Sequence, residues 1–423
     1  MNTAVVLFGS LALLVVINIP IAISLGLSSA ITMLYIGMPV TAIPSILQAT
    51  VQKFSLLTIP LFVLAGIVMD KGGISKRLIN LANSIIGSIP GGLGYVSVLT
   101  SMFFAAISGS GTATVAAIGT IMIPSMIRQG YDAAYTSALS AISGSLGTVI
   151  PPSITFLIYG MITGESISDL FLSGIIPGII FGACLCVSVF WESRKYGWRG
   201  DDARPSLKDF MVFFREALWG LMSPVIVLGG IYSGIFTPTE AAAVAVIYSF
   251  IVGILIYKEI DFKKFVEALS ETAITTGIIL LIIMNAGVFA WLLTQQGIAA
   301  QLTEMALAFT SNKYVMLFVI NIIFLIAGCV MDNTSALYIL VPIIMPIAHA
   351  LGINMVHLGT VIVLNLSIGQ VTPPVGPNLY VAADIGRVKF ENICKRMVPL
   401  LIMSLVALFI VSYVPWLSLA LIR

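Results

Sequence analysis

The sequence is poor in charged residues, and this scarcity excludes most classes of soluble protein. Only 9% of its 423 residues are Asp, Glu, Lys or Arg, whereas 59% are hydrophobic. Soluble domains carry about 25% charged residues, so water is the wrong solvent for most of this surface. The net charge is only +2, and no basic patch is interleaved with aromatic residues. We therefore expect no nucleic-acid partner.

Cysteine and histidine are scarce as well, and both absences exclude chemistry. The four cysteines form no C-x-x-C pair, so they are predicted to be small packing residues. The two histidines, His349 and His357, have no Cys, His or carboxylate at ligand spacing. The sequence therefore predicts neither a redox centre nor a transition-metal site.

Long apolar runs are what the sequence does contain. Residues 3–18 and 407–422 are almost entirely apolar, close to the roughly 20 residues that cross a bilayer. No basic region or small-residue cleavage site accompanies the first run, so it is predicted to be a retained span. The whole chain, 1–423, is predicted to be one all-α polytopic membrane domain. Charged segments separate eight expected spans, at roughly 3–19, 21–37, 56–70, 170–190, 217–236, 239–257, 272–294 and 398–420.

Two regions rich in Gly, Ser and Pro, 92–160 and 314–384, do not resemble simple spans. Each is interpreted as a hairpin that enters and leaves on one side, followed by one interrupted span. All 20 basic residues except Lys53, Lys313 and Arg423 then fall on one face. The positive-inside rule makes that face cytoplasmic. Both termini are therefore expected in the periplasm.

The chain also contains an internal repeat. Pro151-Pro152 and Pro373-Pro374 are 373 − 151 = 222 positions apart. The same offset pairs Thr112 with Thr334, Pro124 with Pro346, Gly130 with Gly352, Ser145 with Ser367 and Gly147 with Gly369. Five expected crossings separate the copies, and an odd number turns the second copy upside down. Inverted repeats with discontinuous helices at their interface are typical of secondary transporters.

This repeat defines the predicted domain organisation. The parts are N-terminal scaffold spans at 1–55, a first repeat at 56–190, a cytoplasmic loop at 191–216, linking spans at 217–271 and a second repeat at 272–423. Within the repeats we expect amphipathic arms at 76–87 and 298–309, re-entrant hairpins at 95–126 and 314–350, and broken helices at 133–160 and 354–384. The arms carry a short apolar stripe, which suits a helix lying in the membrane interface.

The hairpin tips are expected at 106–114, which read A-I-S-G-S-G-T-A-T, and at 328–336, which read G-C-V-M-D-N-T-S-A. A turn inside the membrane leaves backbone groups without helical partners, which is tolerated only where it lines a cavity or is buried in protein. The helix leaving each tip points the positive end of its dipole toward the midplane.

The broken spans read S-G-S-L-G-T-V-I-P-P-S at 143–153 and S-I-G-Q-V-T-P-P-V-G-P-N at 367–378. Two consecutive prolines remove two donors and clash with the preceding turn, so neither helix can continue. Hard cations such as Na⁺ favour oxygen ligands. The predicted ligands are the carbonyls of Gly147, Val149, Gly369 and Val371 and the hydroxyls of Thr148 and Thr372.

Asp332 is the one carboxylate expected at hairpin depth. An acidic residue in a bilayer is costly and usually functional, so it is a candidate cation ligand or proton carrier. It is equally well placed to cap the helix that begins at Asn333 or Thr334. Its repeat equivalent, Ser110, is also a good cap, which favours a shared structural role.

These residues resemble the large membrane subunit of the tripartite ATP-independent periplasmic (TRAP) transporters, over nearly the whole chain. The most specific segments are S-G-S-G-T-A at 108–113, G-T-V-I-P-P-S at 147–153, T-P-T-E-A-A-A at 237–243 and G-Q-V-T-P-P-V-G at 369–376. The resemblance implies an elevator-type transporter of the ion transporter superfamily in the bacterial inner membrane. It implies Na⁺-driven import of an organic acid, with sialic acid as the first candidate and a C4-dicarboxylate as the second. The implied partners are a small four-span membrane subunit and an extracytoplasmic substrate-binding protein.

The resemblance also implies sodium near Ser108, Ser110 and Gly147 in one repeat, and near Gly328, Gly369 and Thr372 in the other. No Lys or Arg is expected at midplane depth to hold a substrate carboxylate, so the hairpin N-termini and neutral donors must do so. The expected substrate-binding residues are Ser110, Gly111, Thr112, Pro151, Pro152, Asn333, Thr334, Pro373, Pro374 and Asn378.

The sequence leaves three alternative functions. A divalent-anion/Na⁺ symporter that works without a binding protein carries Ser-Asn-Thr tips, which 331–335 match in part and 108–112 do not. An intramembrane serine protease is suggested by A-H-A-L-G at 348–352 and by Ser108, but a G-x-S-G motif is absent. A passive channel is disfavoured because two opposed hairpins suggest alternating closure.

Overall fold

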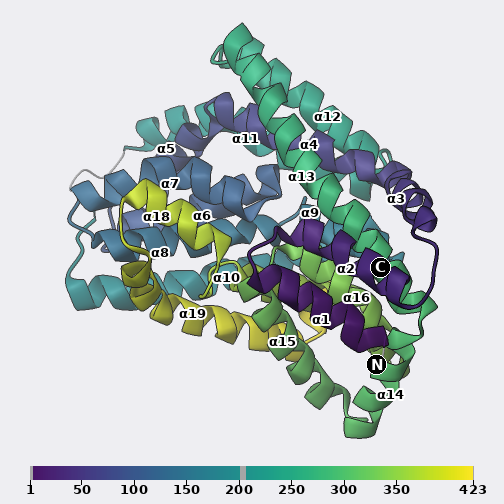
Figure 1. Ribbon diagram of the computed structural model, residues 1–423. Coiled ribbons are helices and arrows are strands. Elements are labelled where there is room, and N and C mark those ends of the chain that lie inside the picture. The colour runs from purple at the N-terminus through teal and green to yellow at the C-terminus, as the bar shows by residue number, and fades with distance from the viewer. Residues whose placement is uncertain (1–2, 201–205, 423) are drawn as a thin grey trace.

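The computed structural model describes residues 3–200 and 206–422, and within these ranges every regular element is helical. The first half of the chain, shown in purple to teal in Figure 1, forms α1 Thr3–Val16, α2 Ile21–Tyr35, α3 Ile43–Val51, α4 Thr58–Lys71, α5 Ile74–Ile86, α6 Gly92–Ser108, α7 Gly111–Arg128, α8 Ala133–Gly144, α9 Ile154–Thr163 and α10 Ile167–Tyr196. The second half forms α11 Leu207–Tyr232, α12 Pro238–Phe250, α13 Phe262–Gln295, α14 Ile298–Phe309, α15 Lys313–Val330, α16 Asn333–Ala350, α17 Met355–Gly369, α18 Pro377–Gly386, α19 Phe390–Tyr413 and α20 Trp416–Leu419.

The structure confirms a multi-span membrane protein. In the described part of the chain, nine helices are long and apolar enough to cross a bilayer. They include α7, α15 and α16, so length alone does not separate the hairpin arms from full crossings. The helix α3 was not expected from the sequence. The segment between α10 and α11 is shorter than the predicted loop at 191–216, because α10 continues to Tyr196 and α11 begins at Leu207; residues 201–205 of that loop lie outside the described residues.

Both expected hairpins are helix–turn–helix units with bounds close to those predicted. Helices α6 and α7 meet at Gly109–Ser110, called the first tip here, and α15 and α16 meet at Met331–Asp332, called the second tip. Gly109 has a φ of 62°, a left-handed conformation that glycine adopts without steric cost. In Figure 1 the two hairpins occupy different parts of the molecule, with α7 on the left and α15 and α16 at the lower right.

Both expected broken helices are interrupted at their proline pairs. Between α8 and α9 a short 3₁₀ turn, Ser145–Thr148, leads into Pro151-Pro152, and the gap between α17 and α18 contains Pro373-Pro374. Both Pro-Pro peptide bonds are cis. We call 145–153 the first break and 370–376 the second break. Each break leaves backbone groups outside a helical ladder.

The helix bounds repeat with the same offset of 222 residues that the sequence contains. Shifted by 222, the bounds of α7 become those of α16, 333–350. The first residue of α8 likewise becomes the first residue of α17, and α9 becomes 376–385, one residue from α18. The two units therefore share one plan of secondary structure.

The two broken helices run antiparallel. Their contacts, in order along the first of them, join Ser137 to Gly386, Ala141 to Asn378, Ser145 to Ser367 and Tyr159 to Met355. Residue numbers rise on one side of this series and fall on the other. The antiparallel crossing brings the first break against α17, where Ser367 bonds to Thr148 and to the carbonyl of Ser145.

Basic residues collect at one end of the helices. Arg77 forms an ion pair with Glu259 at 2.6 Å, and Arg396 donates a hydrogen bond of 2.6 Å to the hydroxyl of Tyr196. Arg396 also lies 3.3 Å from a carboxylate oxygen of Asp132.

Lys53 and Lys313 lie at the opposite end. The Lys53 ammonium donates to the carbonyl of Met161, in the last turn of α9, at 3.3 Å. Lys313 begins α15, where Tyr413 donates to the carbonyl of Tyr314. Helix α19 is continuous from the Arg396 end to Tyr413, so the two groups of basic residues are separated by its length.

The T-P-T-E segment at 237–240, between the two units, forms a helix cap and not a binding site. Thr237 accepts a hydrogen bond from the backbone N–H of Glu240, and Glu240 accepts from the backbone N–H of Thr237 at 2.8 Å. This reciprocal capping box, with Pro238 at the first helical position, explains why α12 begins here.

Candidate functional site

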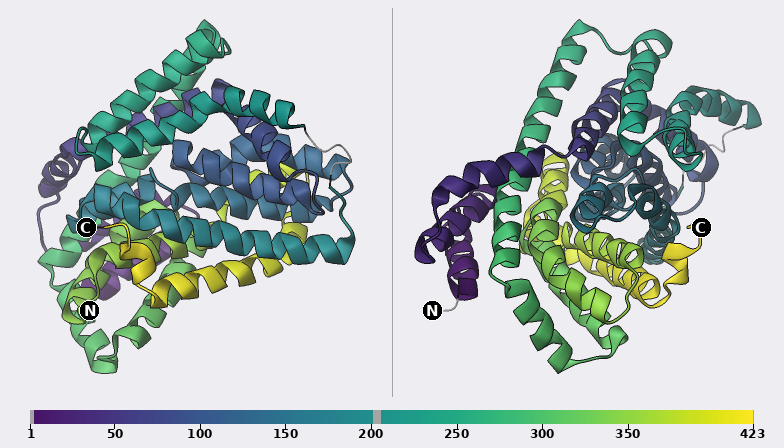
Figure 2. Two further views of the ribbon diagram at one scale, coloured as in Figure 1. Left: turned by 180° about the vertical axis from the view of Figure 1, so that it is seen from behind. Right: turned by 90° about the vertical axis from the view of Figure 1, so that its right-hand side faces the viewer.

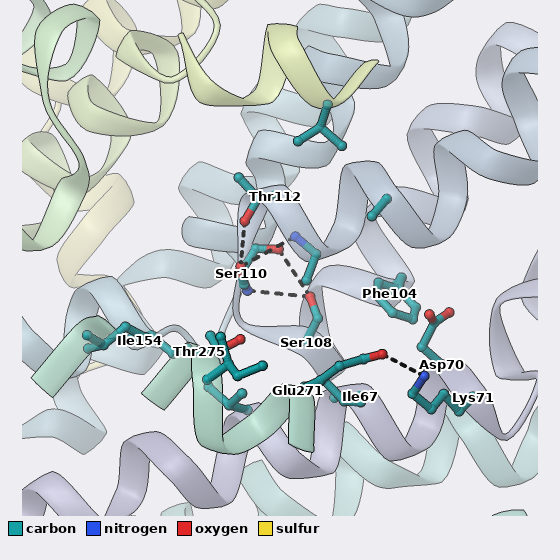
Figure 3. Close-up of a pocket in the computed structure, with 17 residues that line it drawn as sticks. Ile67, Asp70, Lys71, Phe104, Ser108, Ser110, Thr112, Ile154, Glu271 and Thr275 are labelled. Carbon is teal, nitrogen blue, oxygen red and sulfur yellow. Dashed lines mark hydrogen bonds and ion pairs between the residues drawn. The ribbon is translucent and has the colours of Figure 1, made fainter. Parts of the chain in front are cut away.

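Three oxygen atoms converge at the first tip. The Ser108 hydroxyl lies 2.9 Å from the Thr114 hydroxyl and donates to the carbonyl of Ser110 at 3.3 Å. Thr114 donates to the same carbonyl at 2.8 Å. Figure 3 shows the bonds between the labelled Ser108 and Ser110. We call Ser108 Oγ, Ser110 O and Thr114 Oγ1 the first oxygen cluster; an all-oxygen donor set suits a hard cation such as Na⁺.

Gly147 of the first break closes this cluster from the other side. A Cβ atom at Gly147 would meet the Ser110 carbonyl and lie 2.6 Å from Thr114 Oγ1. The backbone of Gly147 therefore touches the cluster only because it has no side chain. The hydroxyl of the next residue, Thr148, is 2.8 Å from Ser367 Oγ of the other unit.

The carbonyls of the first break are partly used by the protein itself. The Thr148 carbonyl accepts a hydrogen bond of 2.6 Å from the Ser153 hydroxyl. Ser153 in turn caps α9 by accepting a hydrogen bond from the N–H of Phe156. Thr148, Val149, Pro151 and Pro152 are all buried.

The second tip is arranged differently, because its carboxylate caps a helix. Asp332 accepts from the N–H of Ser335 at 3.0 Å and from the Ser335 hydroxyl at 2.6 Å. Ser110 caps α7 in the same position, accepting from Ala113 at 3.5 Å. Asp332 therefore caps α16.

Behind the second tip, two helices of the second unit approach each other through glycine. A Cβ atom on Gly369 would lie 2.5 Å from the Cα of Gly328, so the backbones of α15 and α17 are in direct contact there. Thr372 donates to the carbonyl of Ile368 at 2.8 Å. Val371 is buried, whereas Pro373 and Pro374 are exposed.

The residues expected to bind substrate lie in three places. Ser110 and Thr112 sit together at the first tip, with their hydroxyls 3.3 Å apart. Asn333 and Thr334 begin α16, where the Asn333 amide donates to Thr155 at 3.4 Å. Asn378 is fully buried at the start of α18, with its amide 3.5 Å from the Ala141 carbonyl.

Gly111 connects the first of these groups to the last. A Cβ atom on Gly111 would lie 2.7 Å from Gln370 Oε1 and 3.2 Å from Asn378 Nδ2. The second break therefore lies against the first tip.

A cavity of about 510 Å³ opens beside the first tip. It lies between the first hairpin, α4 and α13, and Figure 3 shows Ser108, Ser110 and Thr112 facing it from one side and Lys71 and Glu271 from the other. Lys71 forms ion pairs with Glu271 at 2.8 Å and Glu267 at 3.6 Å. We call this the first cavity.

Sequence reasoning missed Thr114 and Gln370. Thr114 lies one helical turn after Ser110 and was available as a hydroxyl on the same face, so the helical period could have identified it. Gln370 is buried with no hydrogen-bond partner for Oε1 among the described residues. Nothing in its spacing indicates contact with Gly111, because the contact depends on how the two units cross.

The structure gives no support to the protease alternative. Ser108 bonds to other oxygen groups of the first tip, while His349 lies exposed at the far end of α16.

Comparison with known proteins identifies a family to which this chain is similar. A family model described as "Tripartite ATP-independent periplasmic transporter, DctM component" matches residues 8–417. The chain is 42% identical to the isethionate TRAP transporter permease protein DctMQ of Oleidesulfovibrio alaskensis, covering 97% of this chain but only 65% of that longer relative. It is 42% identical to the C4-dicarboxylate TRAP transporter large permease protein DctM of Pseudomonas aeruginosa, over 94% of this chain and 93% of the relative.

A sialic acid relative and a solved transporter are more distant. The sialic acid TRAP transporter large permease protein SiaM of Vibrio cholerae is 36% identical, over 88% of this chain and 87% of the relative. The solved YdaH transporter of Alcanivorax borkumensis superposes with a TM-score of 0.65 at 14% identity, covering 90% of this chain and 88% of that one. At this identity the likeness concerns the fold alone.

Proposed function

The chain belongs to the tripartite ATP-independent periplasmic transporter DctM component family, and from this premise we propose that it imports an organic acid anion together with Na⁺. Its relatives are named as transporter permeases, so it is a membrane transporter subunit and no enzyme. The family implies two partners, a small membrane subunit and a periplasmic binding protein. We propose that the small subunit has four spans and that the assembly lies in the bacterial inner membrane.

One observation carries the Na⁺ assignment. The first oxygen cluster brings Ser108, Ser110 and Thr114 together inside an otherwise apolar bundle, with Gly147 of the first break against it. Polar groups gathered in a membrane interior are costly and usually mark a functional site. A second Na⁺ position is proposed at Gly328, Gly369 and Thr372, with Val149 and Val371 supplying backbone carbonyls to the two positions.

We propose that the two units are inverted repeats. The antiparallel broken helices and the constant offset of the helix bounds support this reading. The end rich in basic residues is then cytoplasmic, and both termini are periplasmic. In the right-hand view of Figure 2, α13 stands between the purple N-terminal helices and the blue first hairpin. The proposed elevator motion carries the hairpins and broken helices along this scaffold.

The substrate is proposed to be held by neutral donors of the two tips. Ser110, Thr112, Asn333, Thr334 and Asn378 are placed at or beside the helix starts of the tips and breaks, where N–H groups and the helix dipole favour an anion. The backbone at Gly111 and at the two proline pairs would complete the pocket. The relatives' names include isethionate, C4-dicarboxylate and sialic acid, so sialic acid is one of several candidates.

The test is uptake in proteoliposomes that contain this chain, its small subunit and its binding protein. Isethionate, succinate and N-acetylneuraminate are offered under an inward Na⁺ gradient or an equal K⁺ gradient. We expect uptake of one of these acids only with Na⁺, and faster when the lumen is negative. Uptake that proceeds equally in K⁺ would refute the sodium assignment. Uptake that needs no binding protein would instead support a stand-alone symporter.

A further inference from the structure

Two cavities lie along the length of α13, on opposite halves of it. The first cavity is lined by Glu271 and Thr275 of α13, and the second, of about 630 Å³, is lined by Trp291 and Thr294. Thr275 and Thr294 are 294 − 275 = 19 residues apart, which corresponds to about 28 Å along a helix. The second cavity lies between α3, α13 and α16, beside the second hairpin, as the first lies beside the first hairpin.

The lining of the second cavity is suited to an anion. It contains one ammonium, that of Lys53, and no Asp or Glu. Its other polar side chains are Ser45, Thr50, Trp291, Thr294, Gln295 and Tyr338. The hydroxyls of Ser45, Thr50 and Thr294 donate to backbone carbonyls one turn earlier, which leaves the donors of Trp291, Gln295 and Tyr338 for an anion. Among the described residues no carboxylate lies within ion-pair distance of Lys53, whose one recorded bond is to the Met161 carbonyl. The charge of Lys53 is therefore available to a bound anion.

The first cavity has the opposite character. Its lysine, Lys71, is paired with Glu267 and Glu271, and Asp70 also lines the cavity. Asp70 and Glu271 line it against one ammonium, which Glu267 also pairs, so the Lys71 side of this cavity offers no unpaired positive charge to an anion. The linings of the two cavities beside α13 thus differ in the sign of their net charge.

We propose that the second cavity is an entry vestibule for the organic acid anion, and that Lys53 is its charged recognition residue. This proposal rests on the proposed function, which makes the Lys53 end extracytoplasmic. The ammonium attracts the carboxylate or sulfonate released by the binding protein, and the neutral donors around it replace water at the anion. Tyr338 is on α16, in the second turn after Asn333, so the vestibule leads toward the second tip.

The first test measures the charge of the cavity without any substrate. Thr294→Cys, an exposed wall position, is labelled in intact cells by the membrane-impermeant reagents MTSES, an anion, and MTSET, a cation, with labelling of the parent chain subtracted. Replacing Lys53 by Gln should lower the MTSES-to-MTSET rate ratio roughly three- to tenfold at low salt, and much less at 0.5 M salt. Lys53→Arg should keep the ratio. Lys313→Gln, at the same end but outside the cavity, is the matched control.

The second test uses the acid that the proteoliposome panel identifies. Lys53→Gln should raise the KM for that acid, delivered by its binding protein, by roughly fivefold with kcat nearly unchanged, because the charge acts on capture. Lys53→Arg should restore the KM, and Lys313→Gln should behave like the parent.

The outcomes separate this proposal from the one it rests on. If the parent transports none of the acids, the proposed function fails, while the labelling ratio still reports the charge and sidedness of the cavity. A labelling ratio independent of Lys53, absence of labelling from outside, or an unchanged KM in Lys53→Gln overturns the vestibule.

Discussion

The two hairpin tips share a backbone plan but differ in their side-chain chemistry. At the first tip the hydroxyls of Ser108 and Thr114 gather around the Ser110 carbonyl. At the second tip the polar group is Asp332, which is bonded to Ser335, and Gly328 and Gly369 bring the backbones of α15 and α17, both in the second unit, into contact. What the repeat preserves is backbone shape, because glycine and proline dictate it, while the ligand-bearing side chains have diverged.

The largest effect is expected from filling the glycine contacts that both tips share. Gly147→Leu and Gly369→Leu should each abolish Na⁺-driven uptake, by more than about 100-fold, because a side chain at either position meets backbone or a tip hydroxyl. Proteoliposome uptake measures this, and gel filtration reports whether the subunit still assembles. The control is Gly229→Leu, since a Cβ at Gly229 meets nothing within 4 Å. Uptake at the parent level in either tip variant would contradict the site assignment.

A selective effect is expected from the first oxygen cluster. Thr114→Val removes one oxygen while keeping the shape of the side chain, and it should raise the Na⁺ concentration for half-maximal uptake by roughly tenfold, about 1.4 kcal/mol. The repeat equivalent of Thr114 is Ala336, so the second tip has no matching hydroxyl. Thr120→Val, an exposed position further along α7, is the control. An unchanged Na⁺ dependence would remove Thr114 from the ion site.

Asp332 distinguishes a structural carboxylate from a transporting one. Because Asn is as good a helix cap as Asp, Asp332→Asn should change uptake by less than about threefold. Asp332→Ala removes the cap and should lower the free energy of unfolding by about 1 kcal/mol. Thermal unfolding in detergent and proteoliposome uptake measure the two effects. Loss of uptake in Asp332→Asn would instead make the carboxylate a cation ligand or proton carrier.

These tips also show how far the sequence could be interpreted. The first hairpin was predicted at 95–126 and lies at 92–128, and the proline pairs located both breaks, because glycine and proline act locally. The ligand oxygens were harder to predict. Gln370 was missed because its contact with Gly111 is made between the two units, and the roles of Asp332 stayed open because capping and ion binding require the same residue type.

The smallest effect is expected at the ion pair that touches neither tip. Lys71 and Glu271 are partly exposed, with 19% and 53% of their side chains accessible, and such pairs contribute about 0–1 kcal/mol. Lys71 also keeps Glu267 as a second partner at 3.6 Å. Glu271→Gln should therefore leave the unfolding temperature within about 2 °C and uptake within about twofold, measured beside Glu267→Gln as the matched single removal. If Glu271→Gln alone changed uptake strongly, the side chains of the two tips would not be sufficient to explain transport. The Lys71–Glu271 pair at the first cavity would then have to act as a gate.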